Sequence, residues 1–108
     1  MLELHQKSEN PQLCMEVMKY TERLLSEERI KMTDAQMLSL LSHISAMVYR
    51  SKYKEMIQPV DKNLFQEVSK QSIEMAGKVC KKLPHLHEDE KYLLSIHFET
   101  AKIEGSMK

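Results

Sequence analysis

The sequence has no tryptophan and only two glycines among its 108 residues, and both scarcities bear on the fold. Gly77 and Gly105 are too few for the many tight turns that a sheet protein of this length needs. The apolar residues include nine methionines and many leucines, which favour helices, while the strand-forming β-branched and aromatic residues are comparatively few. A helical fold is therefore favoured before any pattern is considered.

Cysteines and long apolar runs are also scarce. Cys14 and Cys80 are too few for a disulfide framework, and each lies in an apolar helical pattern, so we expect buried thiols in a reducing compartment. The N-terminal residues 1–7 have neither the basic nor the apolar region of a signal peptide. The longest apolar run, Ala46–Tyr49, has four residues, which is too short to cross a membrane. We expect a cytoplasmic protein.

The chain has no net charge, because 16 basic side chains balance 16 acidic ones. It therefore lacks the global field that attracts nucleic acid or an anionic membrane. The segment Tyr49–Lys54 mixes basic and aromatic residues, as in proteins that bind single strands, but cations also suit the C-terminus of a helix. We expect no direct contact with nucleic acid.

Capping residues and prolines divide the chain into helical segments. Asn10 and Pro11 suit a helix start, and Thr33 and Gln36 can form a capping box that opens the next helix. Apolar residues at helical spacing then predict helices over about residues 11–28, 34–57, 61–83 and 88–104, the third as one helix or two. Gly105 suits the cap that ends the last helix.

These segments predict an all-α fold, a compact antiparallel bundle of four to five helices. We expect a single domain over residues 10–105, with a flexible N-terminus over 1–9 and a C-terminal tail over 106–108. The chain is long enough to bury one core.

Two of the five histidines, His85 and His87, lie beside acidic residues between Pro84 and the last helix. A His-x-His pair with acidic neighbours could hold a metal, but a site needs further ligands at suitable spacing, and we predict no metal site. His87 also suits the N-cap of the last helix. No glycine-rich phosphate loop, G-x-S-x-G, H-E-x-x-H or C-x-x-C motif is present, and we expect neither an enzyme nor a cofactor.

His43 and His97 differ because each lies within a helix beside its apolar stripe. One interpretation is that both are inert histidines at the edge of the core. The other rests on imidazole chemistry, because a neutral ring nitrogen can attack a phosphoryl group. Arg50 follows His43 by about 10 Å of helical rise, so it could contact a phosphate there or pair with a carboxylate from a partner.

Two segments around these histidines resemble the PRD, the phosphotransferase-system regulation domain of bacterial antiterminators and sugar-operon activators. Residues 39–50 resemble its first histidine helix, in which an arginine follows the histidine by seven residues. Residues 83–101 resemble its second, with a proline, an acidic helix start and an aromatic-aliphatic run that ends in histidine. Ser42 stands where the family often has an aspartate.

The resemblance implies a bundle of five helices that the sugar phosphotransferase system phosphorylates on histidine. The donor would be the histidine-containing phosphocarrier or an enzyme II component. His43 and His97 match the phosphorylation sites, and Arg50 matches the associated arginine. We expect a stand-alone regulatory module linked to transcription, present as a homodimer. A structural helical adaptor with unmodified histidines and a phosphohistidine carrier remain as alternatives.

Overall fold

A computed structural model describes residues 2–106 of the chain. In this range the structure has α-helices, one 3₁₀ helix and no strand, which confirms the predicted all-α class. The elements are α1 (Leu2–Lys7), α2 (Pro11–Glu27), α3 (Asp34–Tyr53), η1 (Lys62–Phe65), α4 (Lys70–Cys80) and α5 (Glu90–Ser106).

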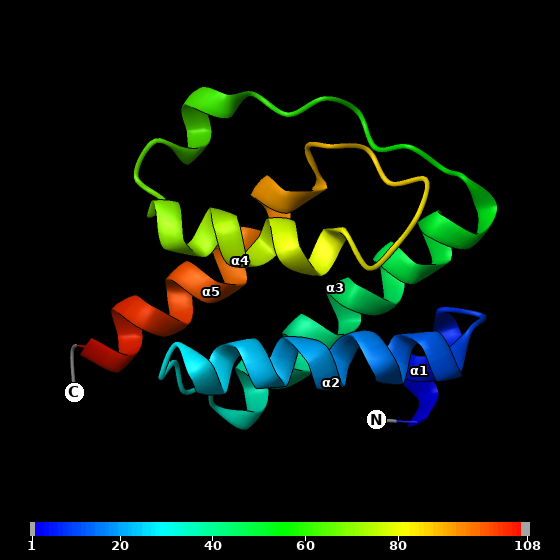
Figure 1. Ribbon diagram of the computed structural model, residues 1–108, viewed down its shortest axis with the longest axis horizontal. Helices are drawn as coiled ribbons and strands as arrows, with labels where there is room; N and C mark the ends of the chain where they lie inside the picture. Colours follow the sequence, from blue (N-terminus) through cyan, green and yellow to red (C-terminus); the bar gives the residue numbers. More distant parts are fainter. Residues whose placement is uncertain (1, 107–108) are drawn as a thin grey trace.

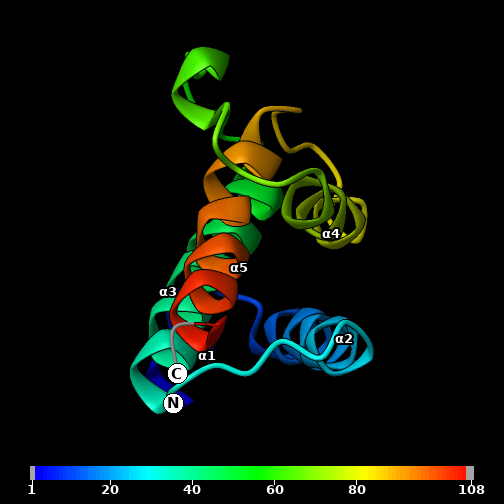
Figure 2. The ribbon, with the colours of Figure 1, turned by 90° about the vertical axis from the view of Figure 1, so that its left-hand side faces the viewer.

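The four longer helices form two antiparallel pairs that cross each other. Helices α3 and α5 lie side by side and run in opposite directions, while α2 and α4 form the second pair in front of them (Figure 1). After a quarter turn, α2 and α4 are seen end-on, whereas α3 and α5 lie along the page (Figure 2). The radius of gyration of 13.2 Å is that of a compact domain of this length.

The core lies where the two pairs cross, and the apolar stripe of each helix points into it. Met47 and Val48 of α3, and Leu94 and Phe98 of α5, have no exposed surface. Their burial removes apolar area from water at about 25 cal/mol per Å², which is the main term that holds the pairs together. Further core residues come from the other helices, namely Cys14, Val17, Met18, Leu24, Leu25, Met75, Ala76 and Val79.

The predicted helix starts are present. The Asn10 side chain accepts a hydrogen bond from the Leu13 N–H, and Pro11 occupies the first turn of α2. Thr33 and Gln36 form a reciprocal capping box at the start of α3. Both devices satisfy backbone N–H groups that the first helical turn leaves unpaired.

The first three helices are followed by residues with side chains in the left-handed conformation, which glycine usually occupies. Glu9, Arg29 and Lys54 follow α1, α2 and α3 in the left-handed region, with φ of 59°, 58° and 56°. Neither glycine has a positive φ. Gly105 lies inside α5, so its predicted capping role is wrong, and Ser106, expected in the C-terminal tail, is the last residue of this helix. Residues 107 and 108 lie outside the described range.

The N-terminal segment and the third helical stretch also differ from the sequence-based expectation. Residues 2–7, expected within a flexible N-terminus, form α1, and the Ser45 hydroxyl of α3 donates to the Leu4 carbonyl. The stretch from Asp61 is a short 3₁₀ turn followed by a separate helix, because Ser69 caps α4 through the Ser72 N–H. The connection before α4 is therefore longer and less regular than predicted.

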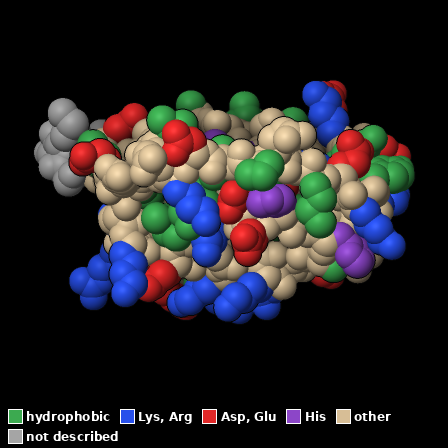
Figure 3. Space-filling view, turned by 90° about the horizontal axis from the view of Figure 1, so that it is seen from above, with side chains coloured by type: hydrophobic (Ala, Val, Ile, Leu, Met, Phe, Trp, Pro, Cys, Tyr) green, Lys and Arg blue, Asp and Glu red, His purple; other side chains and the backbone are tan. Residues whose placement is uncertain are grey.

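The surface carries charges of both signs. On the face seen from above, acidic and basic side chains are mixed, and the basic ones gather along one edge (Figure 3). Within residues 2–106, no helix combines the length and the apolar character needed to cross a lipid bilayer.

Candidate functional site

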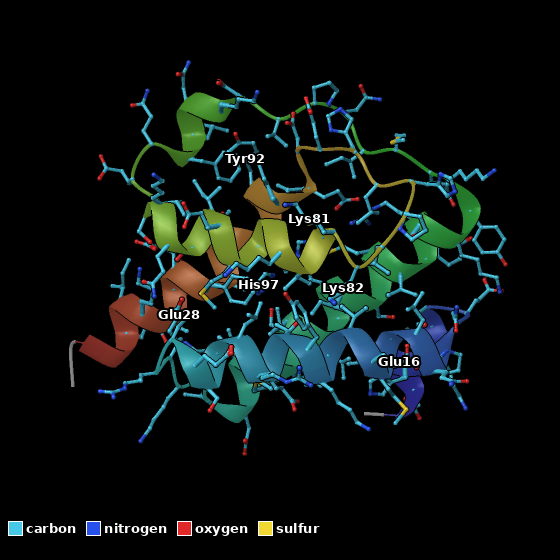
Figure 4. The ribbon with its side chains drawn as sticks, in the orientation of Figure 1. Glu16, Glu28, Lys81, Lys82, Tyr92 and His97 are labelled. Atoms are coloured by element: carbon cyan, nitrogen blue, oxygen red, sulfur yellow. The ribbon has the colours of Figure 1, made fainter. Side chains whose placement is uncertain are left out.

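The antiparallel contact of α3 and α5 brings His43 and His97 together. His43 Nδ1 lies 3.0 Å from His97 Nε2, and the two rings meet edge to face with centroids 4.9 Å apart. His97 lies midway along α5 (Figure 4). Both side chains are half-buried, so the two histidines singled out in the sequence share one site and are reachable from the surface.

The two rings differ in how their remaining nitrogens are placed. His43 Nε2 is enclosed and has no hydrogen-bond partner, whereas the corresponding free nitrogen of His97, Nδ1, is not among the enclosed atoms of the described chain. Burial, His97 and Arg50 lower the pKa of His43 from 6.5 to about 4. Burial also lowers the pKa of His97. Both imidazoles are therefore neutral near pH 7, with ring lone pairs available for nucleophilic chemistry.

Arg50 lies on the same helix as His43 and forms a bidentate ion pair with Glu90 of α5. The distances are 2.7 Å from Nε to Oε2 and 2.8 Å from Nη2 to Oε1. The Glu90 side chain has no exposed surface, while 23% of the Arg50 side chain is exposed. A buried carboxylate is stabilised in this geometry because the guanidinium fork matches its two oxygens.

Glu90 is a site residue that the sequence analysis missed. In the sequence, Glu90 is noticeable only as part of the acidic start of the last helix, where negative charge suits the helix dipole. In the structure Asp89 is also buried, and its carboxylate accepts a hydrogen bond from the Val60 N–H. The His87 ring accepts a hydrogen bond from the Asp89 N–H. Helix α5 begins at Glu90, so His87 lies before the N-cap position suggested for it. The pairing of Arg50 with Glu90 depends on how α3 and α5 pack, so no local pattern could reveal it.

The histidine pair and Arg50 line a groove of about 950 Å³ between α1, α3, α5 and the connection after α3. Its floor is mixed, with apolar side chains beside serine hydroxyls. The other residues that line it are Glu3, Leu4, Ala35, Leu38, Ser39, Ser42, Ala46, Ile57 and Leu93. A groove of this size and composition can admit a small anionic group or the side chain of a docking protein.

The remaining histidines do not line this groove. His85 is exposed at the turn after α4, and His5 lies on α1 with an enclosed Nδ1. In the described part of the chain, no three His, Cys, Asp or Glu side chains come together as a group that could hold a metal ion.

Comparison with known proteins agrees with this architecture. Residues 15–101 match the family model of the PRD domain. The fold is similar to the crystal structure of a PRD-containing transcription regulator from Lactobacillus casei ATCC 334, with a TM-score of 0.86 and 34% sequence identity over 96% of each chain. No match was found among curated proteins.

The fold and the site together define an all-helical domain built around a half-buried histidine pair with an arginine beside it. The family match covers most of the chain, and the structural relative agrees over almost all of it. The chain belongs to the PRD family.

Proposed function

We propose that this domain is a regulatory module whose histidine pair is phosphorylated by the sugar phosphotransferase system of a bacterial cytoplasm. The output would be a change in association with itself or with a partner that controls transcription. Membership of the PRD family and the similarity to a transcription regulator support this role.

The contact between His43 and His97, 3.0 Å apart at the edge of a groove, is the observation that carries the proposal. Two neutral imidazoles at one accessible position offer a nucleophilic nitrogen that can attack the phosphoryl group of a donor protein. A phosphoryl group adds a charge of about −1.5 to −2 and three acceptor oxygens, which changes the electrostatic surroundings of a nearby arginine. Arg50 is that arginine, since it lines the same groove.

Two alternatives make different use of the same residues. A phosphohistidine carrier would pass its phosphoryl group onward. Its histidine would have to be accessible to the donor protein and then to the acceptor protein. The half-buried position of both rings favours a slower, stable modification. A structural adaptor would leave both histidines unmodified.

Phosphoryl transfer from labelled phosphoenolpyruvate through enzyme I and the histidine-containing phosphocarrier, with or without an enzyme II component, separates these roles. We expect stable labelling of the chain and no onward transfer. The double variant His43→Asn/His97→Asn should remain unlabelled, while His85→Asn should label like the unsubstituted protein. Rapid onward donation would indicate a carrier, and an absence of label with every donor would support the structural adaptor.

A further inference from the structure

The contact between His43 and His97 uses one nitrogen of each ring and leaves one nitrogen of each ring free. The two free nitrogens are not equivalent. His43 Nε2 is enclosed and has no hydrogen-bond partner, while His97 Nδ1 is not among the enclosed, unpartnered atoms of the described residues. An attacking nitrogen needs both a lone pair and a path to phosphorus, so access alone already separates the two rings.

The shared hydrogen bond fixes where the lone pair lies. Each neutral imidazole carries one proton, and one proton lies between the rings. If His97 Nε2 donates to His43 Nδ1, the His97 lone pair lies on Nδ1, which is not enclosed as His43 Nε2 is. If His43 Nδ1 donates instead, His97 Nδ1 carries a proton and the remaining lone pair lies on the enclosed His43 Nε2. Only the first arrangement offers a lone pair that a donor can reach.

We propose that His97 accepts the phosphoryl group through Nδ1, and that His43 is a positioning residue that keeps the proton of His97 on Nε2. This inference rests on the proposed function and assigns unequal roles to the two histidines.

The transfer balances without a separate base. The His97 Nδ1 lone pair forms a bond to phosphorus as the bond from phosphorus to the donor nitrogen breaks, and that electron pair returns to the donor. A protonated donor group thereby leaves neutral, while the phosphorylated His97 ring keeps its Nε2 proton and becomes positively charged. The hydrogen bond to His43 Nδ1 then becomes charge-assisted and stronger.

His43 suits this role because it stays an acceptor. Its enclosure on α3 and the neighbouring Arg50 both disfavour a second positive charge on its ring, so it accepts the hydrogen bond without taking the proton. His97 of α5 contacts the His43 ring directly. Arg50, on the same helix as His43, is paired with the Glu90 carboxylate of α5.

The assignment can be tested on the full chain with potassium phosphoramidate, a small donor that needs no protein partner. Long-range ¹H–¹⁵N correlation spectra distinguish the two nitrogens of each phosphorylated ring. We expect the first label in the pair on His97 Nδ1. A first label on His43, or on His97 Nε2, would overturn the assignment.

Asparagine and leucine at position 43 form a matched pair, because they have the same shape and only asparagine places a hydrogen-bond acceptor near the position of Nδ1. We expect His43→Asn to label at His97 about 10-fold faster than His43→Leu, the size of one charge-assisted hydrogen bond. His85→Asn is the control for a histidine lost elsewhere. Equal rates in the two position-43 variants would remove His43 from the positioning role.

The two proposals can fail separately. If the phosphocarrier and enzyme II components do not label the chain but phosphoramidate labels His97 Nδ1, the proposed function fails and the assignment stands. If the protein donors label the chain at His43, the proposed function stands and the assignment fails.

Discussion

Glu90 keeps a carboxylate in the interior of the domain, and Arg50 balances its charge. The two partners are not equally buried, because the Arg50 side chain is 23% exposed and the Glu90 side chain is fully enclosed. We therefore expect Arg50→Gln to lower the free energy of unfolding by about 3–5 kcal/mol, since it leaves a buried charge without a partner. Glu90→Gln should cost less, about 1–2 kcal/mol, because water can solvate the released guanidinium.

Urea titrations of both variants at neutral pH measure this difference. The double variant Arg50→Gln/Glu90→Gln is the control and should be more stable than Arg50→Gln alone, because it removes the unpaired charge. Equal costs for the two single substitutions would show that the unequal burial of the pair does not set its energetics.

The lowered pKa of His43 makes stability depend on pH. The pKa falls from 6.5 to about 4 on folding, because of burial and the neighbouring His97 and Arg50. The unfolded chain therefore binds more protons between these values, and the free energy of unfolding decreases as the pH falls through this window. Between pH 7.5 and 5 we expect a loss on the order of 2 kcal/mol from this group.

The variant His43→Asn isolates that contribution, because asparagine does not titrate. Urea midpoints measured at several pH values should fall less steeply for this variant than for the unsubstituted protein. Parallel curves for the two proteins would assign the acid sensitivity to other groups.

The sequence predicted which side chains belong to the site better than it predicted how they meet. His43 and His97 can be picked out in the sequence because each lies within a helix beside its apolar stripe. Their direct contact is not visible, since they lie 54 positions apart and meet only through the packing of α3 against α5. Arg50 was considered for a phosphate or a carboxylate from a partner, and the structure gives it the carboxylate of Glu90 in the same chain.

At the scale of the helices, features set by nearby residues were predicted from the sequence, and features set by tertiary contacts were not. Their starts were predicted at Asn10 and Thr33, because a cap uses a side chain within three residues of the N–H that it binds. Helix α1 was missed because its support is tertiary, including the bond from Ser45 to the Leu4 carbonyl. The left-handed ends were missed because residues with side chains occupy them instead of glycine.

Arg29 gives the clearest test of those ends. It follows α2 with φ of 58°, where its N–H donates to the Ser26 carbonyl and the Ile30 N–H donates to the Leu25 carbonyl. This is a Schellman arrangement, which favours glycine at the left-handed position. We expect Arg29→Gly to raise the free energy of unfolding by about 0.5–1 kcal/mol, because relief of backbone strain exceeds the added freedom of the unfolded chain.

Thermal or urea unfolding measures this gain. Lys31→Gly, two residues further in the exposed connection and without a positive φ, is the matched control and should be neutral or slightly destabilising. A loss of stability in Arg29→Gly comparable to that in Lys31→Gly would show that the left-handed position carries no strain.

At the scale of the whole molecule, the chain has no net charge, so each added phosphoryl group makes its net charge negative. We expect a homodimer with the histidine grooves near the interface, and phosphorylation should weaken it about tenfold. The reason is that two of the N–H groups of Arg50 already bind Glu90, so its charge is largely balanced and repulsion between phosphoryl groups prevails.

Sedimentation of the unmodified protein, the phosphorylated protein and the variant His43→Asp/His97→Asp measures the shift. Glu90→Gln is the matched variant, because it frees the charge of Arg50 and should reduce the weakening. Identical monomers in all samples would contradict the dimer switch and would leave a separate partner protein as the reader of the modification.

The hydrogen bond between His43 and His97 also has a consequence for genetic work on this domain. A substitution at either position removes one imidazole and, at the same time, the hydrogen-bond partner of the other. The two positions are therefore epistatic, and the phenotypes of the single variants contain a shared contribution that is counted twice when they are added. In an allele that keeps only one histidine, the remaining ring lacks its hydrogen-bond partner. Its reactivity therefore differs from the reactivity of the same ring in the intact pair.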